Sequence, residues 1–364
     1  MKRTSIILAL ALVIALLTGC AGTPVVYYSD CTCPTGAHTE TTPVETTAPV
    51  ETTEPAPVVE GAVKTGVAIV ASALESKSAG DADGEAKYDV SVVAVTVDDN
   101  GVIQSCIIDS IGTSVLFDVS GTIVSDLTAE IPTKNELGDA YNMKLYGNAV
   151  AEWYEQAAAL ASFACGKTVE ELRAGAVDET GHAVDADLAT SATIYLGGYV
   201  SAIENAVFNA EHLGAQAGDE LKLAISSSVD GSKNADAENA GLAELYTSVA
   251  AVTLKEGVIT SCFIDAVQAK VNFDATGTVT TDLSAPIATK NELGEGYGMK
   301  AWGGAIAEWN EQAASFAAYI TGKTPAEVAG IAVDETTKPT DADLLTSVTI
   351  KIGDFQALIA KACN

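Results

Sequence analysis

Thr133-Lys-Asn-Glu-Leu-Gly138 is repeated, residue for residue, as Thr289-Lys-Asn-Glu-Leu-Gly294. The same offset of 156 residues (289 − 133) relates Gly166-Lys-Thr168 to Gly322-Lys-Thr324, and it holds without a gap from Gly101 onward. A solenoid unit is only about 20–50 residues long, so this period is too large for a solenoid. The repeat predicts two tandem homologous domains and a function that two similar modules serve together.

Each copy is expected to begin with β-hairpins. Val90-Ser-Val-Val-Ala-Val-Thr-Val97 is rich in β-branched residues, and a turn ending at Gly101 leads to a return strand over residues 102–109. A second hairpin is expected over residues 115–124, around a turn at Gly121.

Helices are expected later in each copy, beginning with a capping box formed by Thr133 and Glu136. Apolar residues then recur at helical spacing in both copies: Trp153, Ala157, Leu160 and Ala164 in the first, and Trp309, Ala313, Phe316 and Ile320 in the second. The stretch 347–352 alternates as a β-strand does, and a terminal helix is expected over residues 355–362. Hairpins followed by helices predict an α+β fold, in which the β-hairpins of each domain pack against amphipathic helices.

The N-terminus has the features of a lipoprotein signal peptide over residues 1–19. Lys2 and Arg3 precede an apolar run of 12 residues, 6–17, which is shorter than the ~20 residues of a membrane-spanning helix. The run ends in Leu-Thr-Gly followed by Cys20, whose thiol is the expected site of lipidation. We therefore expect the mature protein to be anchored by lipid in the cell membrane and to face outside the cytoplasm.

Residues 20–64 form a segment rich in Thr, Pro and Glu, which predicts a disordered stalk. The expected repeat domain 1 covers residues 65–210, and repeat domain 2 covers residues 219–364. A short connector, residues 211–218, joins them, so the two domains are expected to lie close together.

The chain is strongly acidic, with a formal net charge of −30 that becomes −32 when Lys2 and Arg3 are removed with the leader. A surface of this charge repels nucleic acid and anionic lipid headgroups. We therefore expect no nucleic-acid partner.

Nucleophilic catalysis has little support in the sequence. None of the three histidines, His38, His182 and His212, has a histidine counterpart in the other copy, and His182 corresponds to Lys338. A Ser-His-Asp or Cys-His site would have to be built in one copy alone. These residues favour a carrier or binding protein over a hydrolase, with no catalytic residues assigned.

Acidic loops recur in both copies, with Asp178, Glu179, Asp185 and Asp187 in the first and Asp334, Glu335, Asp341 and Asp343 in the second. Clustered carboxylates are ligands for Ca²⁺, but the spacing of an EF-hand loop is absent. Paired carboxylates also serve glycosidases, although nothing in the sequence fixes their separation. A solvated loop without a metal is the preferred interpretation.

Four aromatic residues, Tyr141, Tyr146, Tyr297 and Trp302, lie in the glycine-rich segment before the amphipathic helix, which is expected to form a loop. Rings in such a loop can stack on a planar ligand or close the end of the hydrophobic core. We favour the second role here.

The segment near the end of each copy carries a family resemblance. Asp187-Leu-Ala-Thr-Ser-Ala-Thr193 and Asp343-Leu-Leu-Thr-Ser-Val-Thr349 resemble the Asp-x-x-Ser-Gly-Ala-Thr segment of the FMN-binding domain family of bacterial extracytoplasmic flavoproteins. In that family the last threonine carries FMN through a phosphoester, added by a flavin transferase. The resemblance implies Thr193 and Thr349 as FMN attachment sites, with Ser191 and Ser347 where the family has glycine.

Tandem copies behind a lipidated stalk are similar to the surface flavoproteins of Gram-positive extracellular electron transfer. That similarity implies a flavin transferase and a membrane redox partner, and the flavin would supply the redox chemistry. The alternative is a surface binding or adhesion module without a cofactor, in which duplication raises avidity.

Overall fold

The computed structural model describes residues 61–147 and 149–364 of the 364-residue chain. All of these residues belong to one compact unit. Each half of that unit contains three strands followed by helices, and the predicted α+β class is confirmed. The expected leader (1–19) with Cys20, and all but the last residues of the expected stalk, lie outside the described residues.

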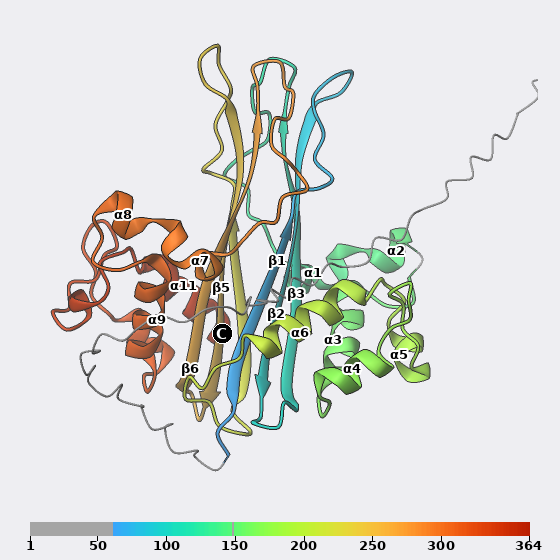
Figure 1. Cartoon of the computed structure of the whole chain (residues 1–364), viewed down its shortest axis with the longest axis vertical. Coiled ribbons are helices and arrows are strands. Elements are labelled where there is room, and N and C mark those ends of the chain that lie inside the picture. The colour runs from blue at the N-terminus through green and yellow to red at the C-terminus, as the bar shows by residue number, and fades with distance from the viewer. Residues whose placement is uncertain (1–60, 148) are drawn as a thin grey trace, which may run out of the picture. The chain divides into compact units, whose positions relative to one another are not determined.

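The first half runs from β1 to α6 (Figure 1). Its elements are β1 (Lys64–Ser72), β2 (Gly84–Val97), β3 (Ile103–Phe117), α1 (Lys134–Leu137), the 3₁₀ helix η1 (Gly138–Tyr141), α2 (Met143–Gly147), α3 (Trp153–Ala164), α4 (Val169–Gly175), α5 (Ala186–Ser191) and α6 (Gly197–Phe208).

The second half repeats this order, except that a 3₁₀ helix replaces α5. Its elements are β4 (Glu220–Ser228), β5 (Gly241–Lys255), β6 (Val258–Phe273), α7 (Lys290–Leu293), η2 (Gly294–Tyr297), α8 (Met299–Gly303), α9 (Trp309–Ile320), α10 (Pro325–Ala329), η3 (Leu344–Thr346) and α11 (Gly353–Cys363).

Each half forms a three-stranded antiparallel sheet with its second strand in the middle. The predicted hairpin joins β2 to β3 and is longer than expected, because Gly84 pairs with Phe117 at its far end. The second predicted hairpin is short, and Phe117 pairs with Ile123 around the turn at Gly121. These local pairings agree with the turn and strand pattern of the sequence.

The first strand of each sheet, β1 or β4, was not predicted from the sequence. In β1, Gly66 directly precedes the apolar run of residues 67–71 and sits where α6 packs against the strand. A Cβ atom at Gly66 would lie 2.0 Å from the carbonyl oxygen of Ala206. Gly66 therefore permits a close approach of helix to strand that any side chain would prevent.

The central strand β2 is buried on both faces, which explains its nearly continuous run of valines. Val90, Val92 and Ala94 pack into a core between the two sheets. Val93 and Val95 pack against the helices of the first half. The chain thus forms successive layers of helices, sheet, sheet and helices.

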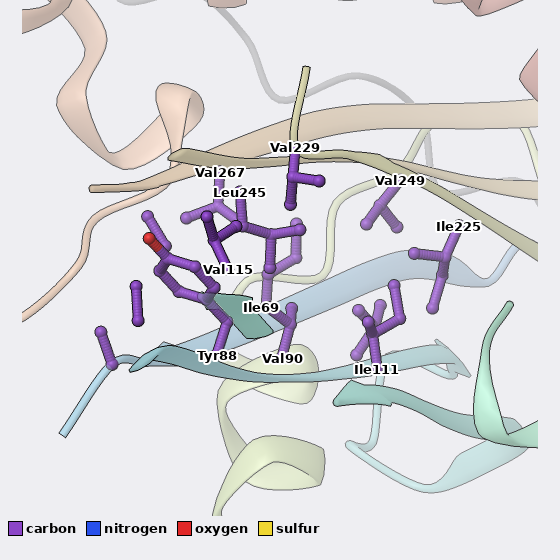
Figure 2. Packing of buried hydrophobic residues seen from close by; sticks show 14 of the residues in the cluster. Ile69, Tyr88, Val90, Ile111, Val115, Ile225, Val229, Leu245, Val249 and Val267 are labelled. Carbon is purple, nitrogen blue, oxygen red and sulfur yellow. The ribbon is translucent and has the colours of Figure 1, made fainter. Parts of the chain in front are cut away.

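The two halves share the core between their sheets. The rings of Phe117 and Phe273 stack with centroids 4.0 Å apart, and the Tyr88 hydroxyl donates to the carbonyl oxygen of Ala243 at 2.8 Å. Figure 2 shows side chains from both sheets pointing toward one another, among them Tyr88, Val90, Ile111, Leu245, Val249 and Val267. The expected boundary at residues 211–218 stays a prediction, since the halves meet in one core.

The predicted amphipathic helices are confirmed as α3 and α9, and all eight apolar residues named for them are buried. The capping box of Thr133 and Glu136 is present at α1. The terminal helix is confirmed as α11. Helical spacing and caps are local signals, and the sequence carries them directly.

Two predictions for irregular segments are wrong. Residues 347–352 form no strand and connect η3 to α11. The glycine-rich segment is not a plain loop, because η2 and α8 lie within it. Both segments bond to α9: Gln312 accepts the amides of Thr349 and Ile350, and the N-cap Glu308 accepts those of Met299 and Lys300.

Candidate functional site

A buried glutamine holds each of the two candidate threonines. The Gln156 side-chain oxygen Oε1 accepts hydrogen bonds from the backbone amides of Thr193 (2.8 Å) and Ile194 (3.1 Å). In the second half, Gln312 Oε1 accepts from Thr349 (2.8 Å) and Ile350 (3.2 Å). These amides bond to a side chain, which is why the expected strand does not form.

The glutamines are positioned by α3 and α9, where both are fully buried. Their Nε2 groups donate at 2.8 Å to the carbonyl oxygens of Ala151 and Ala307, which fixes Oε1 toward the threonine segment. The sequence analysis missed them. Their signal was a polar residue repeated at the 156-residue offset on an otherwise apolar helix face.

The two threonines differ in their exposure as residues. Thr193 is exposed and Thr349 is half-buried. Their Oγ1 atoms lie 3.4 and 3.2 Å from the glutamine oxygens. Ser191 ends α5 and Ser347 has a φ of −128°, so neither position needs the conformational freedom of glycine.

A pocket of about 390 Å³ opens beside Thr193, lined by the next two residues, Ile194 and Tyr195. Trp153 and Tyr199 form another wall, edge to face with ring centroids 5.9 Å apart. Lys134 adds a cation to the pocket, with Nζ 5.1 Å from the centroid of the Trp153 ring. Its other lining residues include Tyr141, Met143 and Val70. The result is an aromatic pocket with one positive charge.

In the second half, the side chains of Lys290 and Tyr246 lie at the position that corresponds to this pocket. Lys290 is buried, and its Nζ donates to the Tyr246 hydroxyl at 2.9 Å. Burial lowers the pKa of Lys290 to about 8 and raises that of Tyr246 to about 12. Strand pairing places Asp89 at the position of Tyr246 in the first half, since Asp89 pairs with Gly112 and Tyr246 with Gln268. The two candidate sites are therefore unequal.

The aromatic residues of the glycine-rich segment divide into two pairs. Tyr141 and Tyr297 lie over Lys134 and Lys290, with ring centroids 5.4 and 4.8 Å from Nζ, and are partly buried. Tyr146 and Trp302 are 84% and 90% exposed. The expectation that this set closes the core is therefore wrong for the second pair, because each of those rings projects into solvent from a short helix.

The carboxylates of the acidic loops bind the loops' own backbone. Asp178 Oδ1 accepts from the amides of Thr180 (2.8 Å) and His182 (3.2 Å), and hydrogen bonding lowers the pKa of the Asp178 carboxyl. Asp185 caps α5 by accepting from Asp187 and Leu188 amides. Within residues 61–147 and 149–364, no group of three or more His, Cys, Asp or Glu side chains is arranged to hold a metal ion.

The histidines make side-chain contacts typical of surface loops. His212 Nε2 lies 2.9 Å from Asp99 Oδ1, and His182 Nδ1 lies 3.1 Å from Thr180 Oγ1. Both rings are exposed. His38 lies outside the described residues.

Two buried carboxylates also escaped the sequence analysis. Asp109 and Asp265 occupy the same position in β3 and β6, and each accepts the amide of the second residue of α1 or α7, Asn135 (3.1 Å) or Asn291 (3.0 Å). Burial raises the pKa of both, that of Asp265 to about 6. They attach the Thr-Lys-Asn-Glu helices to the sheets.

No family model, curated protein or solved structure matches this chain. Among the residues that the structure describes, no helix has the length and apolar character needed to cross a membrane.

Proposed function

We propose that this chain is a lipid-anchored surface protein that carries FMN on Thr193 and relays electrons outside the cytoplasm. The observation that carries the proposal is the position of Thr193, an exposed residue directly before Ile194 and Tyr195, which line an aromatic pocket that contains Lys134. Cys20 is the proposed lipidation site, and the two halves are proposed to be homologous domains derived by duplication.

The residues of the pocket fit a flavin. Tyr195 and Tyr199 offer aromatic surfaces for a planar ring system, and the buried Trp153 closes the pocket behind them. Lys134 offers an ammonium for the flavin phosphate, and it is the one Lys or Arg residue that lines this pocket. When bound, the flavin would supply the electron-transfer chemistry, and these side chains would orient it and limit its contact with water.

A covalent ester at Thr193 suits this protein better than reversible binding. At a net charge of −30, free FMN is repelled over long range, and one lysine opposes that field only locally. Gln156 fixes the backbone of Thr193, and Thr193 remains an exposed residue that a transferase can approach. Thr349 is proposed as the weaker acceptor because it is half-buried.

Co-expression with a flavin transferase tests the proposal. We expect flavin fluorescence that survives denaturing electrophoresis in the wild type and falls by more than half in Thr193→Ala. Thr190→Ala is the matched control, since this exposed hydroxyl lies on the same segment and bonds only to the Asp187 carbonyl oxygen. A wild-type protein without bound flavin, or full labelling of the Thr193→Ala variant, would contradict the proposal.

A second candidate, a surface binding module without a cofactor, is favoured by the exposed rings of Tyr146 and Trp302. These residues occupy the same position in the two copies, and an exposed aromatic at both gives a bivalent contact. Binding to a glycan array that disappears in a Tyr146→Ser plus Trp302→Ser variant would support this function. Equal binding by both proteins would refute it.

A further inference from the structure

A second, larger cleft of about 980 Å³ lies at the junction of the two halves. It is bounded by β1 and α6 from the first half and by β6, α7 and α9 from the second, and it shares no lining residue with the aromatic pocket. Its walls are part apolar and part polar, and the residues that matter here are Ile69, Asn205, Asp265, Asn291, Glu292 and Asn310.

The repeat provides a template for this cleft at the opposite junction. There α11 of the second half faces α1 of the first, and Lys361 Nζ forms an ion pair with Glu136 Oε1 at 2.5 Å. The same ammonium donates to the carbonyl oxygen of Ile225 at 2.6 Å. Glu136 uses its other oxygen, Oε2, to accept the Thr133 amide of the capping box.

Residues equivalent to the acceptors Glu136 and Ile225 line the cleft, but no lysine or arginine does. At the 156-residue offset, Glu292 corresponds to Glu136 and Asn205 to Lys361, and strand pairing relates Ile69 of β1 to Ile225 of β4. Glu292, Asn205 and Ile69 all line the cleft. Glu292 Oε2 accepts the Thr289 amide at 2.8 Å, as in the other half. No side chain among the described residues forms an ion pair with Glu292, so Oε1 is available.

Two further acceptors in the same walls lack donors. Asn291 Oδ1 and Asn310 Oδ1 are the buried side-chain atoms without a hydrogen-bond partner in the described part of the chain. The amide of Asn291 is oriented by its Nδ2, which donates to the Ile264 carbonyl oxygen at 3.1 Å. Unsatisfied buried acceptors are rare in native proteins, and these two lie directly behind the wall of the cleft.

We propose that this cleft binds a small primary amine with an alkyl chain. Its ammonium pairs with Glu292 as the ammonium of Lys361 pairs with Glu136, and its chain lies along Ile69 and the other apolar residues of the wall. The acidic surface raises the local concentration of such a cation.

Calorimetric titration of the full chain with n-hexylamine tests the site, with 1-hexanol as the uncharged comparison. We expect one site for the amine and none for the alcohol. Glu292→Gln should weaken amine binding at least about tenfold, as expected for loss of one charge-assisted hydrogen bond. Glu136→Gln, which alters the equivalent capping box, should leave that affinity within about twofold.

Two exchanges between the halves sharpen the test. Asn205→Lys supplies the missing ammonium from the chain itself, so it should abolish amine binding and raise the melting temperature. Lys361→Asn removes the internal ammonium, so it should create a second amine site. No binding to the wild type, or unchanged binding in both Glu292→Gln and Asn205→Lys, would overturn the proposal.

Discussion

Gln156 and Gln312 show how one side chain sets the path of the segment that carries a candidate threonine. Each accepts two backbone amides from that segment and is fully buried on its helix. A buried amide without an acceptor costs about 1–3 kcal/mol. The conformation of the segment that contains Thr193 therefore depends on Gln156, which is 37 positions away in the sequence.

Replacing Gln156 with leucine should lower the free energy of unfolding by about 3 kcal/mol, because the amides of Thr193 and Ile194 lose their acceptor. Urea denaturation measures this change. Gln104→Leu serves as the control, since Gln104 is exposed and its substitution should stay within about 0.5 kcal/mol. Equal effects of the two substitutions would contradict the assigned role of Gln156.

The buried Asp265 carboxyl gives the stability a defined pH dependence. Its pKa is raised by burial from 3.8 to about 6, so the folded state binds more protons than the unfolded state between about pH 4 and 6. The contribution of Asp265 to stability therefore falls as pH rises through this window and is constant above it. A pKa difference of about 2 corresponds to roughly 3 kcal/mol.

The stability of the wild type relative to Asp265→Asn should accordingly decrease by up to about 3 kcal/mol between pH 4 and pH 6. Urea denaturation of both proteins at several pH values measures this difference in the free energy of unfolding. The exposed carboxylates are present in both proteins, so their contributions cancel. A difference that is flat or rises with pH would show that Asp265 is not a protonated buried group.

Among the secondary-structure elements, the helix N-caps are predicted directly by the sequence, because a capping box involves residues only three positions apart. The Thr168 side chain accepts the Glu171 amide at the start of α4, and the Glu171 carboxylate accepts the Thr168 amide at 2.9 Å. Both partners are on the surface. The box therefore acts on one helix alone.

Thr168→Ala should cost about 1 kcal/mol in the free energy of unfolding, as is typical for loss of an N-cap. Thr168→Ser should recover most of that loss, because the hydroxyl is retained. Thermal denaturation of the two variants makes the comparison. A serine variant as unstable as the alanine variant would show that the hydroxyl does not cap α4.

Prediction from the sequence succeeded for elements whose signals are local. It failed where contacts with residues distant in the sequence determine the backbone conformation. The spacing of Trp153 and Leu160 predicts α3 because a helix buries one of its faces. The strand expected over residues 347–352 is wrong because Gln312 takes the amides that a strand would pair. Thr193 was predicted as a site residue from a motif. The aromatic pocket beside it combines residues from β1, β2, α1, η1, α2, α3 and α6 with Ile194 and Tyr195. No spacing in the sequence predicts that these residues come together.

For the whole molecule, the shared core implies that the two halves fold together. Phe117 from the first half and Phe273 from the second stack where β3 and β6 end, at one end of the interface between the sheets, and are fully buried. Neither sheet can cover this face with its own helices, which lie on its other side.

Phe117→Ala should therefore destabilise both halves together, by about 4 kcal/mol. Trp153 reports on the first half and Trp309 on the second, so single-tryptophan variants can follow each half by fluorescence. We expect coincident unfolding transitions before and after the substitution. Transitions that separate, with only the first half destabilised, would indicate two independent domains.

The functional account depends most on Thr193. Its most direct test is peptide mass spectrometry of the full chain after co-expression with a flavin transferase. The account predicts an FMN adduct on the peptide that contains Thr193, at higher occupancy than on the peptide that contains Thr349. Unmodified peptides at both positions, from a preparation in which a known flavin acceptor is labelled, would contradict it.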